Sequence, residues 1–286
     1  MQEFRGRVAV VTGAASGIGR ALARRFADLG MRLALADVQA DALREVEREL
    51  AARGAEVVSR RTDVSRADEV EALAATARDA FGRVHVVCNN AGVFTGGLAW
   101  EHSVADYEWL LGVNVWGVIH GIRTFVPMLL AQGEEGHVVN TASMAAVIHM
   151  PFTAAYTLSK HAVLSLSETL YHELAIQQAP IGVSVVCPEL VATRIGDAER
   201  NRPPHLKRGE ETGDSPERKL VEQAIRDSTA QQGISPDTIA ERTLAAIREK
   251  RFYVLAEDDW KRACDVRCED LKLARNPTLV VPGMAR

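Results

Sequence analysis

The sequence predicts an α/β fold, a Rossmann-like, doubly wound parallel sheet of about seven strands with helices on both faces. Short apolar runs alternate with amphipathic stretches from the start of the chain, such as residues 40–53 and 66–81. The runs have no alternating polar face, which is typical of strands that helices cover on both sides. Right-handed crossovers then produce the doubly wound order. The expected strands are residues 8–12, 32–37, 55–62, 84–89, 136–142, 182–188 and 252–255.

Two segments depart from this alternation, although the sequence predicts a single domain over residues 1–286. Residues 195–235 are polar, carry Pro203, Pro204 and Gly209, and predict a lid or a mobile surface loop. Residues 258–286 predict a C-terminal extension, a helix followed by an apolar tail at residues 278–282. We expect that tail to cover the sheet edge or to pack on a neighbouring subunit.

The composition argues against several classes of partner. The formal net charge is −4 and both signs of charge are interspersed, so we expect no nucleic acid or anionic membrane as partner. The apolar run at residues 8–11 is too short for a signal sequence or a membrane span, and we expect a cytoplasmic protein. The cysteines lack the spacing of a disulfide framework or a metal site, so no metal is expected. They are Cys88, Cys187, Cys264 and Cys268.

The first expected strand runs into the sequence TGAASGIG at residues 12–19. Its glycines, Gly13, Gly17 and Gly19, allow the backbone to approach a ligand where a helix begins. The helix N-terminus directs N–H groups and its positive dipole end at an anion, which favours a pyrophosphate site. The spacing differs from the usual G-x-G-x-x-G of dinucleotide-binding turns, so a tight turn without a ligand is the alternative.

Asp37 ends the second expected strand, where a carboxylate can accept hydrogen bonds from the hydroxyls of an adenosine ribose. The same charge repels a 2′-phosphate. The residues that could offset this repulsion, Ser16, Val38 and Gln39, are neither Lys nor Arg, so Asp37 favours NAD over NADP. A second role as N-cap of the following helix, residues 40–50, is compatible with the first.

Two further strand ends carry polar residues. Asp63 follows the third strand, where its carboxylate suits either an adenine amino group or the N-cap of the next helix. Asn90, Ala91 and Gly92 follow the fourth strand. The amide can hold loop backbone, and the small residues allow a cofactor to lie across the strand end. Ordinary turn chemistry explains these residues as well.

Tyr156 and Lys160 occupy positions i and i+4 of an expected helix and therefore share one face. An ammonium beside a phenol lowers the pKa of the phenol, which can then exchange a proton with an alcohol near neutral pH. Ser143 ends the fifth strand, at the sheet edge where ligands of such folds bind. Taken singly, the pair also suits a core tyrosine with a surface lysine, and Ser143 suits a polar turn residue like Thr141.

Together these motifs resemble the short-chain dehydrogenase/reductase family in its compact single-domain form. The resemblance covers roughly residues 7–194, in the order and spacing of the family. It implies a single NAD-binding and catalytic domain. The matching residues are the TGAASGIG turn, Asp37, Asp63, the NNAG segment at 89–92, Asn114, Ser143, Tyr156, Lys160, Pro188, Val191 and Thr193.

The resemblance implies a catalytic role for four of these residues. Tyr156 would be the general acid/base, and Lys160 would bind the nicotinamide ribose and lower the pKa of Tyr156. Ser143 would hold and polarise the substrate oxygen. Asn114 would anchor a water that links Lys160 to bulk solvent in a proton relay.

The resemblance also implies a set of cofactor contacts, in which Val191 and Thr193 would hold the nicotinamide carboxamide. Glu189 departs from the family, which usually has glycine after Pro188. Its side chain would either enter the nicotinamide region and contact substrate or point to solvent. The expected cofactor-binding residues are Gly13, Ser16, Gly17, Ile18, Gly19, Asp37, Asp63, Val64, Asn90, Ala91, Gly92, Tyr156, Lys160, Pro188, Val191 and Thr193.

These observations predict an NAD-dependent alcohol dehydrogenase or ketoreductase acting on a secondary alcohol or its ketone. The alternatives are NADP-linked carbonyl reduction, a dehydratase or epimerase on the same fold, and a non-catalytic dinucleotide-binding sensor or scaffold. The resemblance further implies a homo-oligomer, a tetramer or dimer, pairing through the helices that contain Asn114 and Tyr156.

The expected substrate pocket is largely apolar. Val147, Ile148, Met150 and Phe152 predict a bulky secondary alcohol that is aryl, terpenoid or steroid-like. We expect His149, in the same stretch, to be a surface residue rather than a substrate contact. The pocket is expected to be formed by residues 94–100, 145–152 and 189–195 and by the 195–235 insert as a substrate lid.

Overall fold

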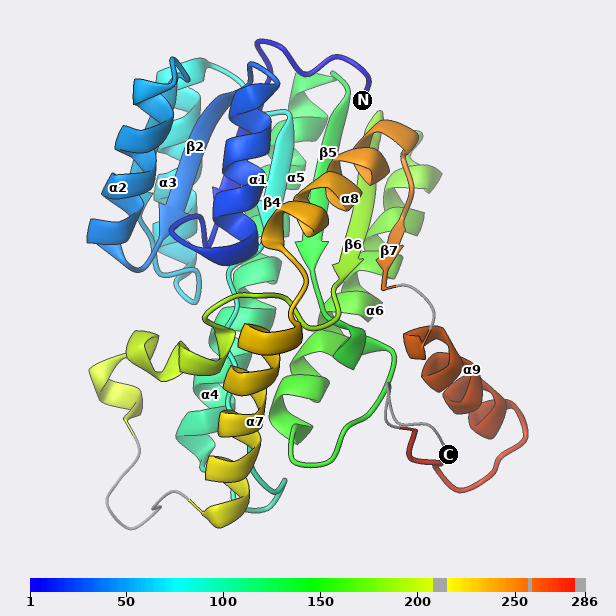
Figure 1. The fold of residues 1–286 in the computed structure, drawn as a ribbon. Helices are drawn as coiled ribbons and strands as arrows, with labels where there is room; N and C mark the ends of the chain where they lie inside the picture. The colour runs from blue at the N-terminus through cyan, green and yellow to red at the C-terminus, as the bar shows by residue number, and fades with distance from the viewer. Residues whose placement is uncertain (208–214, 257–258, 281–286) are drawn as a thin grey trace.

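A computed structural model describes residues 1–207, 215–256 and 259–280, and its strands form one seven-stranded sheet (Figure 1). The strand order is β3-β2-β1-β4-β5-β6-β7, and every neighbouring pair is parallel. The order reverses between β1 and β4, the place where open sheets of this kind bind ligands. The predicted fold class is confirmed. The strands are β1 Val8–Thr12, β2 Arg32–Asp37, β3 Val57–Arg61, β4 Val86–Asn89, β5 Gly136–Thr141, β6 Ile181–Cys187 and β7 Tyr253–Leu255.

The predicted strand limits agree with the structure for β1 and β2 and differ by one or two residues for the others. The start of β4 shows one physical reason. Hydrophobicity predicts a strand from Val84, but the imidazole Nδ1 of His85 accepts the Val8 N–H at 3.0 Å. A side chain thus takes the place of a backbone partner before the regular ladder begins at Val86.

Helices cover both faces of the sheet, as predicted (Figure 1). Phe26 of α1 and Ile247 of α8 are fully buried in one apolar cluster, which α2 completes. Leu73 of α3, Phe125 of α5 and Leu170 of α6 are buried in a second cluster with other residues of the strands. The helices of these layers are α1 Gly17–Asp28, α2 Ala40–Ala52, α3 Ala67–Phe81, α5 Gly117–Gln132, α6 Ala154–Ile176 and α8 Pro236–Glu249.

The sequence predicts a helix that contains Asn114, but it does not give the length of that helix. Residues Val104–Gln132 run continuously through α4 (Val104–Leu111), the π-helical turn η1 (Gly112–Trp116) and α5. Ser103 and Asp106 start the helix with a capping box. Among the described residues it is the one helix long and apolar enough to cross a membrane, a test that the core helix of a soluble protein also passes.

The 195–235 insert is mostly helical where it is described. It forms the 3-10 helices η3 (Ile195–Asn201) and η4 (Pro204–Leu206) and then helix α7 (Pro216–Gln232). Ser215 caps α7 by accepting the Arg218 N–H, and Pro216 occupies its first turn, a start signal that the irregular composition concealed. Residues 208–214, which include Gly209, lie outside the described residues.

The C-terminal extension forms the predicted helix, α9 (Asp259–Lys272). Ala263 of this helix and Val280 after it pack in a cluster with Val185 of β6 and Val163 of α6. These contacts attach the extension to β6 and α6, while residues 271–279 are exposed, so the position expected for the tail stays a prediction. Residues 281 and 282 of the predicted apolar tail lie outside the described residues.

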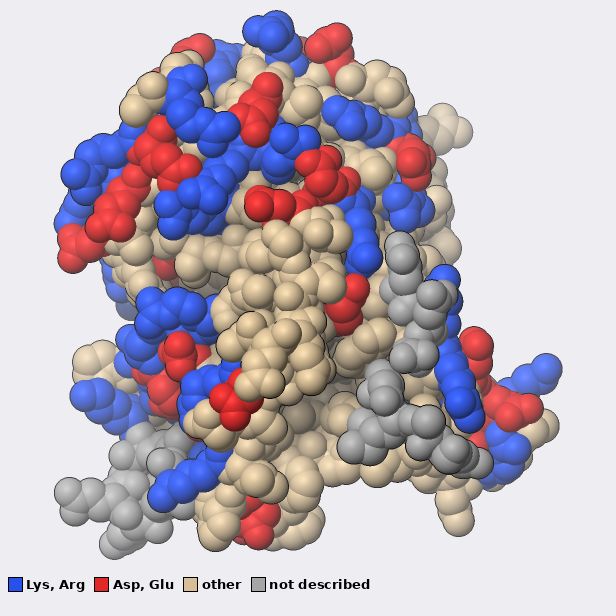
Figure 2. Space-filling view, viewed as in Figure 1, with Lys and Arg blue, Asp and Glu red and all other residues tan. Residues whose placement is uncertain are grey.

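Charged side chains of both signs alternate over α1, α2 and α8 on the face drawn in Figure 2. Glu49 of α2, for example, pairs with Arg20 and Arg24 of α1 at 2.5 and 2.6 Å. Arg20 and Arg24 thus take part in an ion-pair network between α1 and α2. No basic stripe is visible on this face, and the absence of a nucleic-acid partner stays a prediction.

Gly121→Ala should destabilise the fold by about 1–3 kcal/mol, the usual cost of overpacking a filled core. Gly121 lies where α5 crosses β4, and an added Cβ would clash with the amide of Asn89. Gly112→Ala, on the same long helix, is the control. An added Cβ at Gly112 would lie 3.4 Å from Ser65 Cβ, which is an ordinary van der Waals contact. Urea unfolding of the variants measures the difference. Equal stability of the two variants would contradict the packing argument.

Candidate active site

The glycine turn between β1 and α1 is shaped for close approach of a ligand. Gly13 and Gly17 adopt positive φ angles of +66° and +53°, which side chains rarely adopt. A Cβ on Gly13 would lie 2.9 Å from Ala91 Cα, and one on Gly17 would lie 2.9 Å from Thr193 Cγ2. Ser16 is the N-cap of α1 and makes no side-chain cap hydrogen bond. These residues fit a pyrophosphate held at the start of α1.

Thr12 and Asn90 hold three strand ends together beneath this turn. The Thr12 hydroxyl accepts the N–H groups of Asn90 and Ala91 at 2.9 and 3.1 Å. The Asn90 side chain donates to the Thr12 carbonyl at 3.0 Å and accepts from Thr141 of β5 at 3.3 Å. Both of the predicted roles for Asn90 are thus compatible, since its amide holds the backbone of a segment that also lines the pocket.

Asp37 faces the same pocket with both carboxylate oxygens hydrogen-bonded. It accepts the Ala15 N–H at 3.0 Å and the Gln39 N–H at 2.9 Å. Burial raises the pKa of Asp37, and these two N–H groups and the charge of Arg200 oppose the shift. The N-cap of α2 is Gln39. The alternative role of Asp37 as that cap is therefore wrong, because its carboxylate bonds the N-cap residue itself and not the first turn of α2.

Asp63 and Val64 lie in the pocket at the end of β3, as predicted. Asp63 accepts from the backbone and the hydroxyl of Ser65 at 3.0 and 2.7 Å. Arg66 is the N-cap of α3, so the alternative role of Asp63 as that cap is also wrong. Its carboxylate stabilises the turn before the helix.

Tyr156, Lys160 and Ser143 converge at the other end of the pocket. Tyr156 is half-buried at the start of α6, with its ring edge-on to Phe94 at 5.1 Å between centroids. Lys160 is buried, one helical turn on, and its Nζ donates to the Thr141 carbonyl at 3.1 Å. Nζ lies 5.6 Å from the centre of the Tyr156 ring. The predicted i and i+4 arrangement is present, with the lysine buried and not at the surface.

Burial dominates the acidity of both groups in the protein chain itself. It raises the pKa of Tyr156 above the usual value, and a hydrogen bond with Ser143 opposes that shift. Burial also lowers the pKa of Lys160 to about 8, because desolvation penalises the ammonium. The Tyr156 pKa of the protein chain alone is therefore shifted upward, and the group that opposes the shift is Ser143; the expected lowering by Lys160 stays a prediction.

Asn114 lies in the π-helical turn η1, a deviation that often marks functional sites in helices. Its buried side chain accepts the Val93 N–H at 2.8 Å and donates to the Val93 carbonyl and to the Ser159 hydroxyl, both at 3.0 Å. These bonds join η1 to α6 beside Lys160. The side chain is therefore a structural brace, and a role of Asn114 toward water stays a prediction.

Residues 188–193 complete the pocket after β6. The Pro188 carbonyl accepts the Met144 N–H at 3.0 Å, next to Ser143. Glu189 does not point to solvent, since Arg242 of α8 donates to its Oε1 at 2.9 Å and its Oε2 is buried without a hydrogen-bond partner. Val191 and Thr193 line the pocket where predicted, and Thr193 touches the glycine turn.

One pocket joins all the predicted catalytic and cofactor residues except Asn114 and Gly19, which lie behind its wall. Of the apolar side chains predicted for the substrate pocket, Phe94, Ile148 and Met150 line it, and so do residues of the predicted 189–195 segment and of the insert, such as Leu190 and Leu206. Val147 and Phe152 do not. His149 is exposed and stacks on His161 at 4.7 Å, in agreement with its prediction as a surface residue.

Sequence reasoning missed several residues that line the pocket, including Trp109 of α4 and Trp260 of α9. Trp260 comes from α9, and no local signal connects that helix with the site. Arg200 of η3 lies near Asp37, where each charge affects the pKa of the other. Arg200 belongs to the insert that was predicted to form part of the pocket, but the irregular composition of the insert gave no reason to single this residue out. Among the described residues, no group of three or more His, Cys, Asp or Glu could hold a metal ion.

A family model for short chain dehydrogenases matches residues 7–203. The chain belongs to this family. It is similar to a short chain dehydrogenase/reductase of Burkholderia phymatum that was solved in complex with NAD. The similarity covers 98% of this chain and 99% of that chain, with a TM-score of 0.96 and 45% sequence identity. The chain is also 38% identical over 253 residues to a 1-deoxy-11-beta-hydroxypentalenate dehydrogenase of Streptomyces avermitilis, which covers 88% of this chain and 84% of that one.

A third similarity concerns the cofactor. The chain is also similar to an alcohol dehydrogenase of Thermococcus sibiricus that was solved with 5-hydroxy-NADP. This similarity covers 87% of this chain and 94% of that chain, with a TM-score of 0.69 and 28% sequence identity. The predicted class, a short-chain oxidoreductase with a nicotinamide dinucleotide cofactor, is supported by these comparisons.

Lys160→Met should stabilise the protein at pH 7 in the absence of a dinucleotide, by about 1–3 kcal/mol. The folded-state pKa of about 8 lies below the ordinary lysine value, so folding at pH 7 forces a charged ammonium into the interior. This penalty is fully present below pH 8 and disappears as the pH rises toward ~10.4, where unfolded lysine also loses its proton. Chemical denaturation at pH 7 and pH 10 measures the advantage. An advantage of equal size at both pH values would contradict the assignment.

Proposed function

We propose that the chain is an NAD-dependent alcohol dehydrogenase or ketoreductase that acts on a secondary alcohol or its ketone. The observation that carries the proposal is the convergence of Tyr156, Ser143 and Lys160 in the pocket that also holds the glycine turn and Asp37. A dinucleotide extended between these two ends would place its nicotinamide beside the phenol. A non-catalytic dinucleotide-binding sensor or scaffold would have no need for a buried ammonium next to that phenol.

When it is bound, a nicotinamide dinucleotide would supply the hydride chemistry of the reaction. The protein's own residues then handle the proton and the substrate oxygen. The Ser143 hydroxyl, next to Tyr156, holds the oxygen, and the Tyr156 phenol gives or takes its proton. The Lys160 ammonium stabilises the phenolate form. Exchange with solvent would follow the relay that the resemblance assigns to Asn114.

The choice of NAD over NADP rests on Asp37. Its carboxylate sits at the adenosine end, where a 2′-phosphate would meet a negative charge, and the Burkholderia phymatum relative was solved with NAD. Arg200 adds a positive charge to the same end of the pocket, which favours the NADP-linked alternative. We propose that Asp37 decides the preference because its carboxylate is fixed by two N–H groups.

The substrate we propose is a bulky, apolar secondary alcohol. The apolar side chains of Phe94, Ile148, Met150, Leu206 and Trp260 line the pocket. The Streptomyces avermitilis relative, named for a dehydrogenase of a hydroxypentalenate, fits the terpenoid part of this class. Dehydration or epimerisation on the same fold would give no net change in dinucleotide absorbance.

We also propose a homo-oligomer, a dimer or tetramer, in the cytoplasm. Trp116 and Leu158 are each 50% exposed, and they lie on the two helices that contain Asn114 and Tyr156. These exposed apolar side chains support a subunit interface formed by the two helices. Light scattering would measure the mass, and a monomer at micromolar concentration would contradict the proposal.

Tyr156→Phe should reduce turnover of an apolar secondary alcohol by at least about 100-fold, since positioned proton transfer contributes that much or more. Binding of NAD should be retained, because the ring stays in place against Phe94. NADH formation at 340 nm measures turnover and calorimetry measures NAD binding. Turnover close to that of the parent protein would overturn the catalytic assignment.

Asp37→Ala should narrow the preference for NAD over NADP. Removing the carboxylate takes away a ribose acceptor and the charge that repels a 2′-phosphate, while Arg200 remains. The kcat/KM ratio for the two cofactors, measured with one substrate, should fall by about tenfold or more, equivalent to ~1.4 kcal/mol. A parent protein that prefers NADP would show that the ribose argument is wrong.

A further inference from the structure

The insert reaches the end of the pocket opposite the catalytic group. The Asn201 Oδ1 at the end of η3 accepts a hydrogen bond from Gln39 Nε2 at 2.6 Å, so the insert joins the segment that follows β2. Gln39 and Asn201 both line the pocket, next to Asp37. A segment predicted as a substrate lid therefore spans the adenosine end as well.

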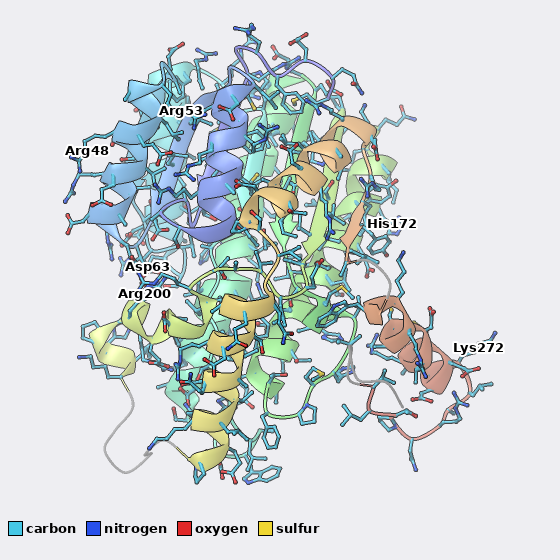
Figure 3. All side chains as sticks on the ribbon, in the orientation of Figure 1. Arg48, Arg53, Asp63, His172, Arg200 and Lys272 are labelled. Carbon is cyan, nitrogen blue, oxygen red and sulfur yellow. The ribbon has the colours of Figure 1, made fainter. Side chains whose placement is uncertain are left out.

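Arg200 brings a positive charge to the same place. Its guanidinium and the Asp37 carboxylate each shift the pKa of the other, and Arg200 and Asp63 line one pocket. Figure 3 shows Asp63 and Arg200 at the same end of the sheet, Arg200 on η3 and Asp63 after β3. The carbonyls of Arg194 and Asp197 fix one guanidinium nitrogen at 2.9 and 2.7 Å. The charge is thus held by η3 itself.

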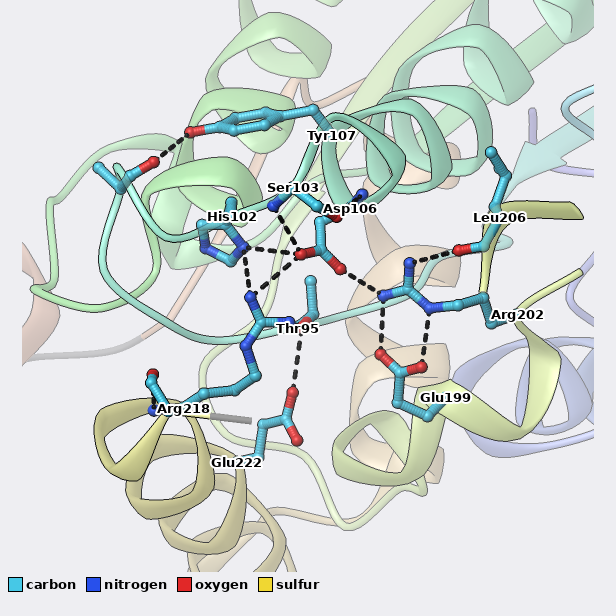
Figure 4. A network of polar contacts seen from close by, with 12 residues as sticks. Thr95, His102, Ser103, Asp106, Tyr107, Glu199, Arg202, Leu206, Arg218 and Glu222 are labelled. Atoms are coloured by element: carbon cyan, nitrogen blue, oxygen red, sulfur yellow. Dashed lines mark hydrogen bonds and ion pairs between the residues drawn. The ribbon is translucent and has the colours of Figure 1, made fainter. Parts of the chain in front are cut away.

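A buried ion cluster fixes this part of the insert to the body of the protein (Figure 4). Asp106 of α4 is fully buried and accepts from Arg202 at 2.7 Å and from Arg218 of α7 at 3.0 Å. Arg202 also donates to both oxygens of Glu199, at 2.8 Å each. Its guanidinium lies 4.1 Å from the centre of the buried Trp109 ring. The Asp106 carboxylate of α4 thus binds both described parts of the insert, the segment that ends at residue 207 and helix α7.

Apolar packing continues from the cluster toward the catalytic group. Ala198 of η3 is buried among Trp109, Leu110 and Ala155, and Leu206 and Tyr156 pack against the same cluster. The segment of residues 195–206 is therefore seated along the pocket, with Arg200 and Asn201 at one end and Ala198 and Leu206 nearer to Tyr156.

We propose that Arg200 and Asn201 form an adenosine-side closure over the dinucleotide, held in register by the Asp106–Arg202 pair. The inference rests on the proposed function, because it takes a nicotinamide dinucleotide as the ligand. The Asn201–Gln39 contact bridges the two rims of the adenosine end, so the dinucleotide leaves only after this contact opens. The closure sets the rate of dinucleotide release and leaves proton transfer at Tyr156 unchanged. Asp106 and Arg202 are positioning residues that act through η3.

A double-mutant cycle on NADH release tests the closure. The variants are Gln39→Ala, Asn201→Ala and the double variant. Each protein is loaded with NADH and then mixed with excess NAD, without any alcohol or ketone. Stopped flow follows the loss of NADH fluorescence as NADH leaves the protein. Each single change should raise the release rate about three- to tenfold, the equivalent of one hydrogen bond. The double variant should be no faster than the faster single variant, because both remove the same contact. Lys219→Ala, an exposed cation of α7, is the control and should release NADH at the parent rate.

Additive effects in the cycle, or single variants that release NADH at the parent rate, would overturn the closure. A parent protein that shows no NADH fluorescence change would instead defeat the proposed function, so the two failures are distinguishable.

Arg202→Lys tests the positioning role of the ion cluster. Lysine keeps the positive charge near Asp106 but cannot reproduce the fork of hydrogen bonds to Glu199 and Asp106. NADH release should accelerate about as much as in Asn201→Ala, while the near-ultraviolet circular dichroism stays that of the folded parent. A folded variant with unchanged release would show that the cluster does not position η3. If the variant does not fold, Glu199→Gln, at a half-exposed partner of the same arginine, gives the same test with the same expected acceleration and the same contradicting result.

Discussion

Burial of the Lys160 ammonium is the constraint on which the site depends. The side chain is 3% exposed and donates to the Thr141 carbonyl, so the cost of removing its charge from water lowers its pKa to about 8. The position is held because β5 supplies that carbonyl and α6 carries Lys160 on the same face as Tyr156. The bond between Asn114 and Ser159 secures α6 to η1 at this point. The fold therefore maintains a charge that burial alone makes unfavourable.

The two ends of the pocket follow from parallel topology. The carboxyl ends of β1, β2 and β4 bring the glycine turn, Asp37 and Asn90 to one edge, and β5 and β6 bring Ser143 and Pro188 to the continuation of that edge. A dinucleotide with an adenosine end and a nicotinamide end matches this arrangement. The hydrogen bonds of Thr12 to Asn90 and Ala91 keep the two halves of the edge in register.

Sequence reasoning identified what local patterns and strand order determine. The apolar runs located all seven strands, and the i and i+4 spacing placed Tyr156 and Lys160 on one face, because both rest on short-range geometry. It could not find contacts between distant parts of the chain. Asp106 pairs with Arg202 and Arg218 across the fold, and no local pattern marks them as partners. The alternative capping roles of Asp37 and Asp63 are wrong for a similar reason, since the Asp37 carboxylate bonds the distant Ala15 N–H and the Asp63 carboxylate bonds Ser65 in a tight turn.

Tyr156 must become acidic enough to exchange protons with an alcohol once NAD is bound, because the positive charges of the nicotinamide ring and of the Lys160 ammonium would both favour the phenolate. The most direct measurement is the pKa of Tyr156 with and without NAD, from the ultraviolet difference between the parent protein and Tyr156→Phe across pH. We expect a pKa above the usual tyrosine value in the protein alone, because burial raises it. Saturating NAD should lower it toward neutrality. A Tyr156 pKa that is the same with and without NAD would contradict the account.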